Sequence, residues 1–436
     1  MGESVAGGVD ALPHGLDLRL RARAKRAALW VRAQGAAGRT ITVVHHIDAD
    51  GVSAGAIAST ALERAAVPFR TLAVKSMDQL HQDRVRAEGG DALWFCDLGS
   101  TVYMQFPKAE RLVCDHHELV RDGSEESFPH VNPLLDGLPG DTVSGAGCAY
   151  LVAAALDARN LDLSPMALVG AAADLQERRG GFSGTNALLA QQGRAAGLLD
   201  TATDLAFFGP ETRPLRKFLS LGEPNVPTVT GDSRSAEAFL AAAGVEVTAD
   251  GEERAWSALD EGERRRVRSL LVERLLDAGL RERVGGLWRE VVTLRSETPG
   301  SPTRELREFG TLLNSTARYG RPEIGLAVAR GDRGDAYDAA LDLLTGHRRN
   351  LMASLQHFSN AGIEELTAIQ VVHLQDRVMD TVVGIVCGMA LDGLGLARDK
   401  ALVAFAYTPD GRTKVSARSP HELQARGIDL AAALRS

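Results

Sequence analysis

Aspartate and histidine residues stand directly after apolar runs in the N-terminal part of this chain. The runs are ITVV, ALWFC, RLVC and ALVGAAA. The residues that follow them are His46, Asp48, Asp50, Asp97, Asp115, His116, His117 and Asp174. Ionised carboxylates in a low dielectric repel one another by several kcal/mol, so such a cluster needs cations. Carboxylates with imidazoles and no cysteine favour Mn²⁺ or Mg²⁺ over structural Zn²⁺. We therefore predict that these residues bind two divalent cations and form a site that hydrolyses phosphate esters.

The segment HIDADG carries two of these carboxylates two residues apart. On a strand this spacing puts both on one face, whereas in a tight turn they can diverge toward two ions. Gly51 permits a sharp exit, and the helix that follows offers its positive N-terminus to an anion. By itself the segment could also be a solvated loop at a strand end. The four groups together, in this order, are far more specific.

A particular fold is needed to bring these groups together. Strand signals (ITVVHH, FRTLAV, ALWFCD and RLVCDHH) alternate with helix signals, the first of them near residues 51–65. Alternating strands and helices with continuous apolar strands predict an α/β fold, a parallel sheet covered by helices on both faces. Ligands bind such sheets beyond the carboxyl ends of the strands. The fourth run, ALVGAAAD, could be a helix or a buried strand.

The chain divides by pattern into four parts: a leader helix in 1–36, a catalytic domain in 37–230, a helical connector in 231–300 and a smaller α/β domain in 301–436. Helical periodicity runs from about 143 to 220, and the charged segment 251–280 predicts one or two amphipathic helices. The strand candidates of the last part are IGLAVA, AIQVVHL, TVVGIVCGMAL and ALVAFAYT.

Composition narrows the class of protein. A chain of 436 residues with 44% hydrophobic residues predicts an ordinary globular protein of two or three domains. The net charge of -8 argues little against a nucleic-acid partner, because five carboxylates belong to the predicted site and two ions would return about four positive charges. No signal peptide and no membrane-length apolar run occurs, so we expect a cytoplasmic protein without a membrane partner. We interpret the four cysteines as buried thiols.

The four metal motifs resemble those of the DHH phosphoesterase superfamily, and within it the RecJ-like single-strand-specific exonucleases, especially the archaeal group. The stretches NPLLDG and SGAGCAYL also resemble the family's segment after DHH. A nucleotide-binding glycine loop is a weak alternative for SGAG, since it does not follow a strand. The resemblance implies an N-terminal DHH domain in 37–230 and a DHHA1-like C-terminal domain in 301–436.

The resemblance also assigns roles to the candidate ligands. His46, Asp48 and Asp97 would hold the first ion. The second ion would be held by Asp50, Asp97, His116 and Asp174, with Asp97 bridging. His117 would face the scissile phosphate as a catalytic residue, and Asp115 would orient the pair. His45 competes with His46 for the ligand role; the family's spacing favours His46.

Two further segments resemble substrate-binding parts of the family. In REFGTLLNSTARYGRPEIGLAVARGD, Asn314 and Arg318 match the core that contacts the nucleic-acid backbone, although Ala317 stands where the family has glycine. An ordinary helix-to-strand turn is the alternative. In KVSARS, Ser416 and Arg418 would contact phosphate. The family continues into a Gly-Gly-His stretch, which the sequence given lacks before Ser436.

The resemblance implies a Mn²⁺- or Mg²⁺-dependent 5′-to-3′ exonuclease on single-stranded DNA, with RNA as an alternative, acting in replication or repair. Single-stranded nucleic acid and a GINS-type replication complex would be its partners. A second hypothesis is an oligoribonuclease or cyclic-dinucleotide phosphodiesterase. A third is a non-catalytic replication scaffold, against which the filled ligand positions count. The residues leave open DNA against RNA, the polarity, Mn²⁺ against Mg²⁺ and the oligomeric state.

Overall fold

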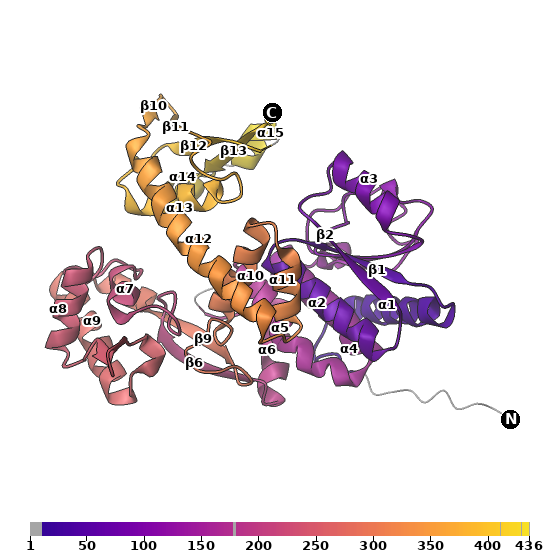
Figure 1. The fold of residues 1–436 in the computed structure, drawn as a ribbon, viewed down its shortest axis with the longest axis horizontal. Coiled ribbons are helices and arrows are strands. Elements are labelled where there is room, and N and C mark those ends of the chain that lie inside the picture. Colours follow the sequence, from indigo (N-terminus) through magenta and orange to yellow (C-terminus); the bar gives the residue numbers. More distant parts are fainter. Residues whose placement is uncertain (1–10, 178–179, 410, 429, 436) are drawn as a thin grey trace. The chain divides into compact units, whose positions relative to one another are not determined.

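A five-stranded sheet forms the centre of the N-terminal part of the protein. The computed structural model describes residues 11–177, 180–409, 411–428 and 430–435 (Figure 1). The strands of the sheet are β1 (Ile41–His46), β2 (Phe69–Val74), β3 (Ala92–Cys96), β4 (Glu110–Cys114) and β5 (His130–Val131). They lie in the order β2-β1-β3-β4-β5, and every pair is parallel. The predicted α/β fold with a parallel sheet is confirmed. Because all strands run the same way, the residues after β1, β3 and β4 meet at one edge.

Helices α1 (Leu18–Ala36), α2 (Ala49–Arg64), α3 (Gln79–Glu88) and α4 (Gly145–Leu156) contact this sheet. Helix α5 (Ser164–Ala173) packs on α2 and α4, and α6 (Gly184–Ala195) packs on α5. Side chains of a strand alternate between its two faces. Accordingly Leu93 and Phe95 pack in one cluster with Val85 of α3, whereas the ring of His45 lies against Gly55 of α2. Helix α4 packs against both α1 and α2. The leader helix α1 thus packs on α4 and on β5 of the sheet.

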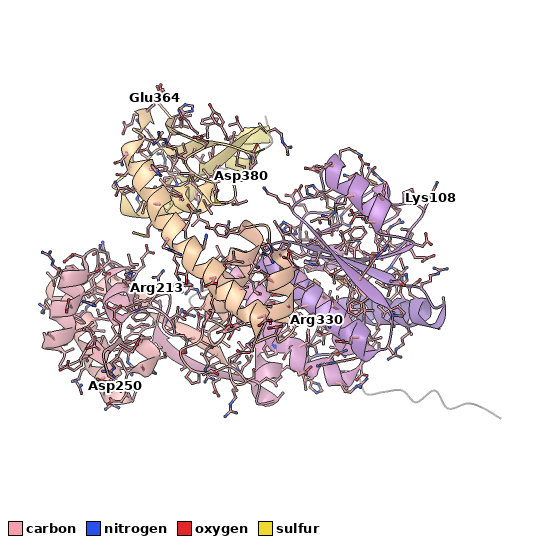
Figure 2. All side chains as sticks on the ribbon, in the orientation of Figure 1. Lys108, Arg213, Asp250, Arg330, Glu364 and Asp380 are labelled. Carbon is pink, nitrogen blue, oxygen red and sulfur yellow. The ribbon has the colours of Figure 1, made fainter. Side chains whose placement is uncertain are left out.

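An insert, residues 206–287, separates the two strands of an antiparallel ribbon. The ribbon consists of β6 (Leu199–Leu205) and β9 (Trp288–Leu294). The insert contains α7 (Leu215–Ser220), α8 (Ser233–Ala242), β7 (Thr248–Ala249), β8 (Glu252–Glu253) and α9 (Glu261–Asp277). Its core is built on Phe218, Phe239 and Trp256, and Arg213 (labelled in Figure 2) lies over the ring of Phe208. The predicted helical stretch to 220 was wrong for β6, where LDTATDL pairs with β9.

Two strand predictions in the last third of the chain were wrong. IGLAVA belongs to the helix α11 (Pro322–Ala329), and TVVGIVCGMAL to the helix α13 (Val383–Gly393). Short apolar runs do not separate a buried strand from a buried helix by periodicity. In α13 the buried residues Val383, Val386, Cys387 and Ala390 recur at helical spacing, which was a signal available in the sequence. The open alternative ALVGAAAD is the helix α5.

The chain packs as two units, Met1–Ala340 and Leu341–Ser436, with the boundary inside α12 (Asp335–Asn360). The first unit also contains α10 (Leu306–Arg318). The second contains β10 (Glu364–Glu365), β11 (Ile369–Gln375), β12 (Ala401–Tyr407), β13 (Thr413–Arg418), α13, α14 (His421–Ala425) and α15 (Leu430–Arg435). Its strands form one sheet in the order β10-β11-β12-β13, so the predicted strands AIQVVHL and ALVAFAYT are confirmed.

The four domain ranges stay predictions. Among the described helices, none is long and apolar enough to cross a membrane.

Buried carboxylates join the insert to α10. Glu308 accepts hydrogen bonds from the backbone N–H of Glu211, at 2.7 Å, and from the hydroxyl of Thr212. Nearby, Arg289 lies between the carboxylates of Glu305, at 2.8 Å, and Glu177, at 3.2 Å. Burial raises the pKa of Glu308 to about 7. Between about pH 4.3 and pH 7, Glu308 therefore keeps its proton in the folded protein, whereas in the unfolded chain, where its pKa is about 4.3, it loses that proton.

This proton makes stability depend on pH. The contribution of Glu308 is fully present below about pH 4.3 and is lost as the pH rises through 7. In Glu308→Gln the side chain at this position is uncharged at every pH. Between pH 4 and 8 we therefore expect the free energy of unfolding to fall by up to about 3 kcal/mol more in the wild type than in the variant. Urea unfolding of both proteins across this range measures the difference. Parallel pH profiles would contradict the assignment.

Candidate metal centre

The candidate ligands stand where strands and helices meet at the carboxyl edge of the sheet. His46 is the last residue of β1, and Asp48 caps α2 by accepting the N–H of Gly51 at 3.0 Å. Asp50 lies in the first turn of α2. Asp97 follows β3 with a φ of +61°, a left-handed conformation that aspartate tolerates better than most residues. Asp174 ends α5. The fourth apolar run thus delivers its aspartate from a helix.

His46, Asp48 and Asp97 form a first group. The Nδ1 atom of His46 lies 2.9 Å from Oδ2 of Asp48 and 3.5 Å from Oδ2 of Asp97. The other ring nitrogen, Nε2, lies 3.2 Å from the carbonyl oxygen of Lys75. A proton on Nε2 would be donated to that carbonyl and leave the Nδ1 lone pair for an ion.

A second group forms around the imidazole of His116. Its Nε2 atom lies 3.8 Å from Oδ2 of Asp50, 3.5 Å from Oδ1 of Asp97 and 3.5 Å from Oδ2 of Asp174. Its Nδ1 atom lies 3.0 Å from the carbonyl oxygen of Gly140, so a proton on Nδ1 would be donated to that carbonyl and leave the lone pair of the inward Nε2 for an ion. Asp97 contributes one oxygen to each group, so the two groups share a carboxylate.

The donor set fits divalent cations. Oδ1 of Asp97 and Nε2 of His116 are buried and have no hydrogen-bond partner among the described residues. Neighbouring ligands of an octahedral ion, each about 2.1 Å from it, lie about 3 Å apart, close to the spacings found here. Although burial opposes it, contact with Asp48 and Asp97 raises the pKa of His46 to about 11. Burial and then the charge of Asp97 raise the pKa of Asp50 well above its ordinary value. The field of the site therefore attracts positive charge.

Two glycines let helices approach this site closely. The N–H groups of Gly145 and Ala146, in the first turn of α4, donate to the carboxylate of Asp50 at 2.7 and 3.0 Å. A Cβ atom on Gly145 would lie 2.5 Å from Oδ1 of Asp97, and one on Gly170 of α5 would lie 2.2 Å from Oδ1 of Asp50. The SGAG segment, weighed as a nucleotide loop, holds a carboxylate of the protein itself. Sequence reasoning missed both glycines as site residues.

Asp115 organises the two neighbouring histidines. Its Oδ1 atom accepts the backbone N–H of His116 at 2.8 Å, that of His117 at 3.2 Å and the Nδ1–H of His117 at 2.8 Å. Its Oδ2 atom accepts the N–H of Ser100 at 3.0 Å. The bond from His117 outweighs burial and holds the pKa of Asp115 below its usual range. The same bond raises the pKa of His117 to about 9, so this half-exposed imidazole carries a positive charge at neutral pH.

A second layer of polar residues supports the turn of Asp115, His116 and His117, here called the DHH turn. Nδ2 of Asn132 donates to the carbonyl oxygen of His117 at 3.0 Å and to Oγ of Ser100 at 2.9 Å. Ser100 in turn lies 3.1 Å from Nε2 of the buried His130. Arg23 of α1 pairs with Asp136 in the same region, at 2.9 Å. The sequence signal for Asn132 was the NPLLDG stretch; Ser100 and His130 had none.

The predicted substrate residues fall in different units. In the first unit, Oδ1 of Asn314 accepts the N–H of Ala49 at 3.0 Å, and Arg318 is near enough for the charge of Asp48 to act on its pKa, which burial lowers. In the second unit, Ser416 and Arg418 lie on β13 against α13. A Cβ atom on Gly384 would lie 2.6 Å from Nη2 of Arg418 and 3.4 Å from Oγ of Ser416. His45, the competing ligand, is buried with its Nδ1 2.8 Å from the carbonyl oxygen of His46 and belongs to neither group.

Metal binding is expected to stabilise the folded protein. An ion that binds the folded but not the unfolded chain raises the free energy of unfolding by about 2.7 kcal/mol at a concentration one hundred times its Kd. We therefore expect Mn²⁺ to raise Tm and excess chelator to reverse the rise. Thermal unfolding with MnCl₂, beside NaCl at equal ionic strength, measures the effect. An unchanged Tm at millimolar Mn²⁺ would contradict the cation site.

Comparison with known proteins places this geometry among related folds. Residues 207–287, which make up nearly all of the insert, match the DHH-CID domain. An uncharacterised protein of Methanocaldococcus jannaschii is 21% identical over 402 residues, covering 90% of this chain and 84% of that protein.

Solved structures of similar fold include RecJ of Thermus thermophilus in complex with Mn²⁺, with 19% identity, a TM-score of 0.55 and 94% of this chain covered. This chain spans about half of that protein, 49% of its length. An exonuclease RecJ bound to manganese has 18% identity and a TM-score of 0.55, with 95% and 85% of the two chains covered. Cdc45 from Entamoeba histolytica has 10% identity and a TM-score of 0.62, with 88% and 85% covered. The chain therefore contains a DHH-CID domain, and its fold is similar to that of the RecJ exonucleases and of Cdc45.

Proposed function

We propose that this protein is a Mn²⁺- or Mg²⁺-dependent phosphodiesterase that removes nucleotides from one end of single-stranded DNA, with RNA as the alternative substrate. The observation that carries the proposal is the shared carboxylate of Asp97, which lies between two complete groups of ligands. We assign His46, Asp48 and Asp97 to one ion, and Asp50, Asp97, His116 and Asp174 to the other. The metal-bound forms of the two similar RecJ structures support this assignment by analogy.

The side chains divide the work of hydrolysis. Two bound ions would supply a water of lowered pKa and neutralise the phosphate oxygens. His117, charged through its bond to Asp115, would donate a hydrogen bond to a phosphate oxygen as negative charge develops there. Asp115 keeps that imidazole oriented, since its oxygens also hold the backbone of the DHH turn. We propose His117 as a catalytic residue and Asp115 as a positioning residue.

The terminal phosphate of the substrate is the ligand we propose for Ser416 and Arg418. The guanidinium of Arg418 lies against the first turn of α13, where the helix dipole favours an anion. Arg418→Ala is therefore expected to raise KM for a 5′-phosphorylated strand about tenfold and to leave Mn²⁺ binding unchanged. Steady-state kinetics on strands with and without the phosphate test this. An equal effect on both strands would contradict it.

The deciding experiment uses 5′- and 3′-labelled single strands of DNA and RNA with Mn²⁺, beside an Asp97→Ala control. Progressive shortening from one end, lost in the control, supports the exonuclease and gives polarity and sugar preference. Intact long strands with cleaved dinucleotides would favour the oligoribonuclease or cyclic-dinucleotide phosphodiesterase instead.

A non-catalytic replication scaffold is the second candidate, because the fold of Cdc45 is also similar to this chain. In this case the protein would contact a replication partner such as a GINS-type complex. The variant Asp97→Ala with Asp174→Ala separates the candidates. An enzyme loses its activity in this variant, whereas a scaffold retains partner binding and the wild type has no activity to lose.

A further inference from the structure

Helix α10 contacts both helices that carry metal ligands. A Cβ atom on Gly310 of α10 would lie 2.7 Å from Cβ of Ala173, the residue before Asp174. The following helix, α11, packs on α2, and Arg330 (labelled in Figure 2) pairs with Glu63 of α2 at 2.6 Å. Helices α10 and α11 are thus fixed against the C-terminal end of α5 and along α2.

Asn314 of α10 makes the most direct contact with the site. Its Oδ1 atom accepts the backbone N–H of Ala49 at 3.0 Å, a bond between residues 265 positions apart. Ala49 stands between Asp48 and Asp50, at the first position of α2. The first N–H groups of a helix have no partner within the helix. Asp48 satisfies the N–H of Gly51. Asn314 satisfies that of Ala49, from outside the helix.

This bond fixes the peptide that separates the two groups of ligands. Oδ2 of Asp48 faces His46 in the first group, at 2.9 Å, whereas Oδ2 of Asp50 faces His116 in the second, at 3.8 Å. Rotation of the peptide between Asp48 and Ala49 would move both carboxylates at once. A single acceptor on that N–H therefore controls the spacing of two sites.

We propose that Asn314 is a positioning residue for the metal centre: it holds the peptide between Asp48 and Asp50 so that each carboxylate reaches its own ion. This inference rests on the proposed two-metal function. It assigns Asn314 to the metal loop, in place of the contact with the nucleic-acid backbone that its motif predicts.

The test compares Mn²⁺ binding to the full chain by calorimetry and electron paramagnetic resonance. Asn314→Ala and Asn314→Leu remove the acceptor, whereas Asn314→Asp keeps an oxygen in the same place. We expect the first two to weaken at least one Mn²⁺ site about tenfold or more, because a buried N–H loses its partner. Asn314→Asp is expected to stay within about threefold of the wild type.

Asn160→Leu serves as the matched control. Asn160 is fully buried and hydrogen-bonded, with Nδ2 2.9 Å from the carbonyl oxygen of Ala153, and it belongs to neither metal group. Its variant is expected to lose stability and to keep the Mn²⁺ affinity of the wild type. A general loss of packing therefore does not imitate the expected result.

Three results would overturn the proposal. Unchanged Mn²⁺ affinity with a raised KM for DNA in Asn314→Ala would make Asn314 a substrate contact. Equal losses in Asn314→Asp and Asn314→Ala would show that the acceptor oxygen is irrelevant. Failure of both Asn314→Ala and Asn314→Leu to fold would give the residue a role in the fold itself. A wild type that binds Mn²⁺ but cleaves no strand refutes the proposed function alone, whereas one that binds no Mn²⁺ refutes both.

Discussion

Asp97→Asn is expected to lower kcat/KM by roughly three orders of magnitude or more while the protein stays folded. Asp97 is the carboxylate that both groups share, with Oδ2 3.5 Å from Nδ1 of His46 and Oδ1 3.5 Å from Nε2 of His116. The amide of asparagine keeps the volume but offers one neutral oxygen in place of two charged ones. Asparagine also accepts the φ of +61° at this position, so the backbone is not strained.

Stability should change in the opposite direction from activity. Asp97 is buried beside Asp50, and removing one of several neighbouring like charges relieves repulsion in the metal-free protein. We therefore expect Tm in chelator to be equal to or higher than that of the wild type, and the increase in Tm with Mn²⁺ to disappear. Asp162→Asn, at the half-exposed pair with Arg64, is the control and should change neither quantity. Full activity in Asp97→Asn would refute the shared-ligand arrangement.

Gly170→Ala is expected to abolish binding at the second group of ligands and to lower activity about a hundredfold or more. The added Cβ atom would lie 2.2 Å from Oδ1 of Asp50 and 2.7 Å from Cβ of Ala146. Asp50 is held by two N–H groups of α4, so it cannot move aside without breaking them. Overpacking of this kind costs about 1–3 kcal/mol of unfolding free energy.

Helix propensity alone predicts that Gly170→Ala raises the free energy of unfolding, because alanine stabilises the interior of a helix by about 1 kcal/mol relative to glycine. Gly346→Ala is therefore the matched control: Gly346 lies in α12, and a Cβ atom there would meet nothing within 4 Å. Denaturant unfolding and Mn²⁺ titration of both variants measure the contrast. A stabilised Gly170→Ala protein with normal Mn²⁺ binding would show that α5 can shift away from Asp50.

Local sequence patterns determined most of the sheet and the set of candidate ligands. The runs ITVV, ALWFC and RLVC are buried as parallel strands, because a strand covered on both faces needs continuous apolar residues. The aspartates and histidines after these runs then necessarily lie close together, since parallel strands end at one edge of the sheet. The same local patterns failed for α11 and α13, whose short apolar runs fit a strand as well as a helix.

Contacts between distant segments were decided by the tertiary structure alone. No spacing in the sequence links Asn314 to Ala49, Gly170 to Asp50 or the carbonyl of Gly140 to the ring of His116. Each depends on the approach of one backbone to a side chain within a few tenths of an ångström. Such distances follow from how helices pack, which periodicity does not specify. The sequence by itself therefore determined which atoms could bind a metal, and the packing of α4, α5 and α10 decided where those atoms lie.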